Sequence, residues 1–65
     1  MPKYPDIKVR LVGEDGNAFA IMARVGGALR DAGVPQAEIE NYYAESTTGD
    51  YDHLLRTAVE WVEVA

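Results

Sequence analysis

The stretch "NAFAIMARVGGALRDAG", residues 17–33, predicts the central helix of the fold, around which the other segments are arranged. Its apolar residues recur at helical spacing as one stripe, which a second set widens towards another side. The stripe consists of Phe19, Met22, Ala23, Gly26 and Leu29, and the second set consists of Ile21, Val25, Ala28 and Ala32. Asn17 is a good N-cap, and Gly33 is well placed as the left-handed residue that ends the helix.

Two consecutive glycines, Gly26 and Gly27, lie inside this predicted helix. Each costs about 0.8 to 1 kcal/mol relative to alanine in a helix, so a compensating contact is expected. We predict that a neighbouring helix, or a large ring such as that of Trp61, approaches the backbone closely there. A functional hinge is the alternative.

The segment "IKVRLV", residues 7–12, has the two-residue period of a half-buried strand. Ile7, Val9 and Leu11 share one face, and the glycines and acidic residues of "GEDGN" form a turn that ends the strand. Two prolines in residues 1–5 favour an extended leader before it.

The tail "WVEVA", residues 61–65, alternates in the same way. Because a single strand cannot satisfy its own backbone groups, we expect the tail to pair with the first strand, in either direction. Glu63 would then lie near Lys8 or Arg10, which gives a favourable pair of charges across the strands.

Between the central helix and the tail, the sequence predicts a second helix that begins with Pro35 in its first turn. Ile39, Tyr42 and Tyr43 supply its apolar positions, and Gly49 closes it after a run of serine and threonine. The short link to the preceding helix implies a helical hairpin.

Asp50 then starts a third helix that is expected to end near Glu60. Its apolar positions are Leu54, Leu55, Ala58, Val59 and Val62. The predicted fold class is therefore α+β and mostly helical, with three short helices packed on a two-stranded β ribbon formed by the N- and C-terminal segments. Residues 1–65 are expected to form one small domain.

Composition argues against several classes of function. The chain has no cysteine, which removes disulfides and thiolate metal sites. Six basic and eleven acidic side chains give a net charge of −5, which repels nucleic acid and anionic lipid. No apolar run is long enough to cross a bilayer. We therefore expect a cytoplasmic protein with no cofactor and no nucleic-acid or membrane partner.

The motif "TTGDYDHLLR" contains two aspartates and the only histidine of the chain. Asp50 can cap the third helix, and both Asp50 and Asp52 suit the positive end of the helix dipole, which leaves His53 to local contacts. The alternative is a small-ligand or metal-dependent site of Asp50, Asp52 and His53, completed by Glu14 and Asp15 if the two glycine turns converge. Glu45 is a further candidate for this cluster.

Large aromatic rings are numerous for so short a chain, and carboxylates flank several of them. Tyr42 and Tyr43, with Glu38 and Glu45, predict a protein-binding surface on the second helix and its flanking turns. The alternative is that the rings complete an undersized core. A chain this short also has difficulty enclosing a substrate pocket, so we expect a non-enzymatic accessory module whose partner is another protein, with self-association as a second option.

Two motifs, "GEDGNAF" and "GDYDHLL", form a signature within the longer segments "LVGEDGNAFAIMARV" and "ALRDAGVPQAEIENYYAESTTGDYDHLLRTAVEWVEV". On these motifs the chain resembles a family of small uncharacterised proteins encoded by bacteria and their phages, over nearly its whole length. The resemblance implies a cytoplasmic or phage-encoded accessory protein and carries over no functional residue.

Overall fold

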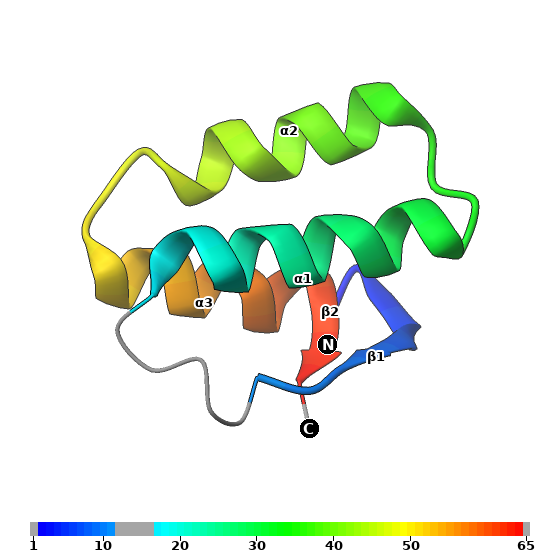
Figure 1. The fold of residues 1–65 in the computed structure, drawn as a ribbon, viewed down its shortest axis with the longest axis horizontal. Helices are drawn as coiled ribbons and strands as arrows, with labels where there is room; N and C mark the ends of the chain where they lie inside the picture. Colours follow the sequence, from blue (N-terminus) through cyan, green and yellow to red (C-terminus); the bar gives the residue numbers. More distant parts are fainter. Residues whose placement is uncertain (1, 12–16, 65) are drawn as a thin grey trace.

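The computed structural model of the chain describes residues 2–11 and 17–64. The elements follow one another as β1 (Tyr4–Val9), α1 (Ala18–Asp31), α2 (Gln36–Ser46), α3 (Tyr51–Trp61) and β2 (Val62–Val64). Successive helices run in opposite directions, with α1 in front of α3 and α2 along the top, and both strands lie together at one end (Figure 1). The predicted α+β class, mostly helical with a ribbon from the two end segments, is confirmed.

The helix boundaries follow the local signals in the sequence. The backbone amide of Ala20 donates to Oδ1 of Asn17 at 3.0 Å, and the amide of His53 donates to Oδ1 of Asp50 at 2.9 Å. These are the side-chain caps expected at the starts of α1 and α3. Gly33, after the end of α1, has a φ of +85°, which is the left-handed conformation predicted for it.

The ribbon is a two-stranded parallel sheet, and β1 begins at Tyr4 rather than at the predicted residue 7. It also ends at Val9 instead of continuing to residue 12. The register passes from Tyr4 opposite Val62 to Lys8 opposite Glu63, so residues between Tyr4 and Lys8 bulge out of the pairing. Pro5 lies in this bulge, where its missing amide proton costs no hydrogen bond between the strands.

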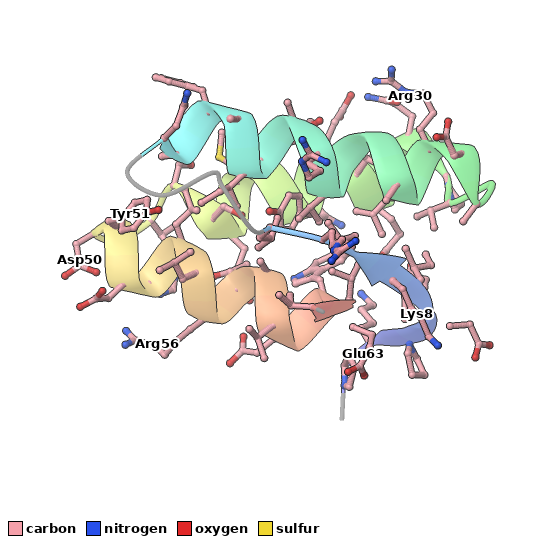
Figure 2. All side chains as sticks on the ribbon, turned by 60° about the horizontal axis from the view of Figure 1, so that its bottom comes forward. Lys8, Arg30, Asp50, Tyr51, Arg56 and Glu63 are labelled. Carbon is pink, nitrogen blue, oxygen red and sulfur yellow. The ribbon has the colours of Figure 1, made fainter. Side chains whose placement is uncertain are left out.

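Lys8 and Glu63 are direct neighbours across the ribbon, as the sequence predicted, and both are labelled on it in Figure 2. Because the strands are parallel, the chain has to cross from one end of the ribbon back to the other between them, and the three helices form that crossover.

The core lies between the three helices and the ribbon. Its buried members are Val9, Val25, Leu29, Ile39, Tyr42, Ala58, Trp61 and Val62. The rings of Tyr42 and Trp61 meet edge to face at its centre, with centroids 5.6 Å apart and planes at 65°. Such aromatic contacts add to the stabilisation from burial alone.

Close approach at Gly26 is confirmed, but the ring is that of Tyr43 and not that of Trp61. A Cβ at Gly26 would overlap the phenol ring of Tyr43 and its hydroxyl oxygen. By contrast, a Cβ at Gly27 would meet no atom of the described structure within 4 Å. One glycine of the pair therefore allows α1 and α2 to pack, and the other does not contribute to that contact.

Candidate functional site

Most side chains of the binding surface predicted on α2 are buried or make contacts within the chain. Tyr42 is completely buried, and burial raises the pKa of its phenol. It belongs to the core, so its ring offers no contact surface in this conformation, contrary to the role proposed for it. Tyr43 is half-buried over Gly26. Of the two tyrosines, only Tyr43 retains surface that a partner can touch.

The two predicted carboxylates on α2 also have partners within the chain. Glu45 accepts a hydrogen bond from the indole Nε1 of Trp61 at 2.5 Å. Oε1 of Glu38 accepts from Nζ of Lys3 at 2.7 Å and from the hydroxyl of Tyr4 at 3.2 Å. The hydrogen bond from Lys3 lowers the pKa of Glu38, and the same contact raises the pKa of Lys3.

The acidic turn before α3 is organised as a helix start. Asp50 caps α3, and Nε2 of His53 lies 2.8 Å from the backbone carbonyl oxygen of Glu45. Because a carbonyl oxygen can only accept a hydrogen bond, Nε2 is the protonated ring nitrogen and is the donor to the Glu45 oxygen. The hydroxyl of Thr48 lies 3.0 Å from the same nitrogen. The imidazole therefore joins the last turn of α2 to the first turn of α3.

Asp52 is exposed in the first turn of α3, where its charge suits the helix dipole. Glu14 and Asp15, which would complete the alternative ligand site, lie outside the described residues. Within residues 2–11 and 17–64, no three histidine, aspartate or glutamate side chains are placed to share a metal ion. The described part of the site thus accounts for Asp50, Asp52 and His53 by capping and local contacts.

Phe19 is a large apolar side chain that keeps 81% of its full exposure. It borders a groove of about 290 Å³ between the first turns of α1 and the junction of α2 with α3. Phe19 and Met22 line it on one side, and Thr47, Gly49, Tyr51 and Leu54 line the other. Figure 2 shows Tyr51 on the side of α3 that faces the start of α1, whereas Asp50 points outward at the helix end.

A second hollow of about 230 Å³ shares Phe19 and Met22 with the groove. Met22, Ala23 and Tyr43 line it together with Phe19. We call the groove and this hollow the Phe19 surface. Tyr43 is the one residue of the predicted binding set that contributes to it.

The apolar stripe predicted for the central helix placed Phe19 with Gly26 and Leu29, but only the latter two are buried. The reason lies in the length of α2. Phe19 precedes Gly26 by about two helical turns on the same face, and Gly26 is covered by Tyr43 of the antiparallel α2. Because α2 ends at Ser46, less than about one turn after Tyr43, it does not extend over Phe19.

The polypeptide around the groove is acidic. Residues 34–53, which span α2 and the turn into α3, contain five carboxylates and neither lysine nor arginine. The carboxylates are Glu38, Glu40, Glu45, Asp50 and Asp52. Glu38 is paired with Lys3 near the ribbon, and Asp50 borders the groove with its carboxylate pointing outward at the start of α3. The field of the carboxylates at the junction of α2 with α3 favours a cationic partner at this end of the molecule.

No protein-family model, curated protein or solved structure matches the chain. The resemblance to small bacterial and phage proteins therefore stays a prediction. In the described part of the structure, no helix has both the length and the apolar character needed to cross a membrane.

Proposed function

We propose that the chain is a non-enzymatic protein-binding module whose Phe19 surface captures a large apolar side chain of a partner protein. The observation that carries this proposal is the exposure of Phe19, 81%, directly beside a groove with apolar walls. An exposed aromatic side chain next to a concave apolar surface is typical of the centre of a protein interface.

The size of the groove favours a side chain over a metabolite. At about 290 Å³ it lies at the lower edge of the range of roughly 300 to 1,000 Å³ occupied by small-molecule sites. It is also open to solvent at the junction of α2 and α3, so it offers little enclosure for chemistry. One aliphatic or aromatic side chain from a partner is the occupant that fits this description.

The charge around the groove indicates the sequence of that partner. Asp50 borders the groove at the start of α3, and Glu45 and Asp52 lie near the same junction of α2 with α3, so the local potential is negative. A lysine or arginine beside the apolar anchor would be attracted to this end of the molecule and would speed association. We therefore propose a basic segment with one large apolar anchor, met in the cytoplasm, where a cysteine-free chain functions without disulfides.

The proposal is tested by selecting binders to the immobilised chain from a library of random displayed peptides. Enriched peptides should combine one large apolar residue with lysine or arginine. Phe19→Ala should weaken their binding by about tenfold or more, because truncation of a central aromatic anchor removes most of the contact. Added salt should weaken binding further.

Val59→Ala is the matched control, since Val59 is 56% exposed on α3 and borders a different hollow. It should leave the affinity of the peptides unchanged. Peptides that bind Phe19→Ala as tightly as the unmodified chain, or that show no preference for basic residues, would contradict the proposal.

A further inference from the structure

A second site lies near the ribbon, on the face of the Trp61 indole. Nζ of Lys3 stands 4.4 Å from the centroid of this ring and 2.7 Å from Oε1 of Glu38. The ring of Tyr4 stands beside that of Trp61, with centroids 6.0 Å apart and planes inclined at 32°. An ammonium group is thus held between an aromatic face and a carboxylate.

The walls of this site are fixed by contacts that do not involve the ammonium group. The indole Nε1 of Trp61 donates to Glu45, which sets the plane of the ring. The hydroxyl of Tyr4 donates to the same Oε1 of Glu38 that binds Lys3. Trp61 is 6% exposed, whereas the Lys3 side chain is 51% exposed. The receptor groups are therefore anchored in the fold, and the cation lies at its surface.

We propose that Tyr4, Glu38 and Trp61 form a binding site for an alkylammonium group, and that Lys3 is its built-in occupant. Aromatic faces combined with a carboxylate are the surroundings that proteins use to recognise lysine and quaternary ammonium groups. A lysine side chain of a partner, or a free amine, would enter by displacing Lys3. This site shares no residue with the Phe19 surface, so its test is independent of the proposed function.

Lys3 can leave the site without unfolding the ribbon. Its backbone amide donates to the carbonyl oxygen of Glu60 at 2.7 Å, so the main chain stays attached to α3 when the side chain moves. The departing side chain breaks one partly exposed ion pair with Glu38 and two cation–π contacts, with the rings of Trp61 and Tyr4, all of the weak surface kind. The occupant should therefore exchange readily with a competing ammonium group.

The first experiment empties the site with Lys3→Ala and follows the fluorescence of Trp61, the only tryptophan of the chain. Butylammonium chloride and an N-acetyl-lysine methylamide are titrated separately, with sodium chloride as the control for ionic strength. Each amine should produce a saturable change in emission. In the unmodified chain, half-saturation should require about tenfold more amine, because Lys3 competes for the same face.

Two further variants identify the site. Glu38→Gln in the Lys3→Ala background should weaken amine binding by about tenfold, since the charge that pairs with the ammonium is lost. Lys8→Ala, in β1 opposite Glu63 of β2, should behave like the unmodified chain. Tighter binding of the blocked lysine than of butylammonium would assign the site to polypeptide lysine, and equal binding would assign it to free amines.

A measurement on the unmodified chain covers the case in which Lys3→Ala does not fold. The Lys3 side-chain protons lie over the indole, so their NMR signals should be shifted by the ring and should move to free-lysine positions as butylammonium is added. Unshifted Lys3 signals that do not respond to the amine would overturn the proposal. So would a folded Lys3→Ala chain whose fluorescence responds to the amines only as it does to sodium chloride.

Discussion

The aromatic side chains at the two ends of the helical layer differ in how far they are buried. At the ribbon end, Tyr42 and Trp61 are enclosed and Tyr4 packs against them. At the other end, Phe19 remains exposed beside its groove. The aromatic character is the same, so the difference comes from whether another element lies opposite each ring. Where α2 and the ribbon meet α3 the rings form a core, and where α2 ends early a ring becomes surface.

Replacing the ring at the enclosed end should have the largest effect. Trp61→Ala should lower the free energy of unfolding by about 3 to 5 kcal/mol, because a large buried ring is replaced by a cavity. For a chain of this length the total is roughly 3 to 10 kcal/mol, so the variant should be near or beyond unfolding. Circular dichroism during urea denaturation measures this without the tryptophan signal.

Phe19→Ala is the matched change at the open end, and it should alter the free energy of unfolding by no more than about 0.5 kcal/mol. If the loss at Phe19 equals the loss at Trp61, the contrast between the two ends is wrong, and Phe19 belongs to the core in solution.

The contact between α1 and α2 can be tested with the two adjacent glycines. Gly26→Ala should destabilise the chain by about 1 to 2 kcal/mol. The new methyl group forces the Tyr43 ring to move, and the free-energy cost of that movement should exceed the gain in helix propensity. Gly27→Ala should instead stabilise it by up to about 1 kcal/mol, since its methyl group meets nothing. Thermal unfolding tests this by the direction of the change in Tm, which should fall for Gly26→Ala and rise for Gly27→Ala. Stabilisation by both alanines would show that Tyr43 does not press on Gly26.

The start of α3 should show a smaller effect. Asp50→Ala should cost about 0.5 to 2 kcal/mol, because the amide of His53 loses its acceptor. Asp52→Ala keeps the cap and removes only a charge near the helix dipole, so it should cost about 0.3 to 1 kcal/mol. Urea midpoints of the two variants can be compared directly. An equal cost for both would mean that charge, and not the cap, is what Asp50 supplies.

The pair between Lys3 and Glu38 should appear as a pH effect. The pKa of Glu38 lies below its ordinary value of 4.5, chiefly because of the hydrogen bond from Lys3. The pair therefore stabilises the fold above pH 4.5 and loses this contribution as the pH falls through the lowered pKa. A carbon-13 NMR titration should give a higher midpoint for Glu38 in Lys3→Ala than in the unmodified chain. Lys8→Ala should leave the midpoint where it was.

Metal ions should have no effect on stability. Asp50 and His53 are engaged in capping and in the bond to Glu45, so neither is free to form a site. Magnesium, calcium, manganese and zinc should each leave the Tm unchanged, because only an ion that binds the native state raises it. A rise in Tm that Asp52→Ala abolishes would restore the alternative of a metal-dependent activity at this turn.

The features that could be predicted from the sequence are those that neighbouring residues decide. The caps at Asn17 and Asp50 and the left-handed Gly33 depend on a few positions each, and all three were confirmed. The pairing of the end segments could be predicted because each strand needs a partner. The start of β1 at Tyr4 could not be predicted, because the two prolines suggested an extended leader. The bulge that accommodates Pro5 depends on the register with β2.

Apart from Tyr43 and Glu38, the residues at the two sites could not be assigned, because their surroundings come from distant parts of the chain. Lys3 and Glu38 are 35 positions apart, and no periodicity links them. The burial of Tyr42 depends on the position of Trp61. The exposure of Phe19 depends on the residue at which α2 ends. The apolar pattern of α1 alone carries no information about that residue. A comparison of the lengths of the two predicted helices is the one signal that could have pointed to it.

The parallel ribbon has a consequence for how the protein is made. Translation delivers β1 before the three helices, and its partner β2 only after them. Until β2 has been made, the nascent chain can form helical turns, but Tyr4–Val9 lacks the strand with which it pairs in the described structure. Closure of the ribbon, and with it the placement of Lys3 over Trp61, must therefore wait until synthesis of this segment is complete.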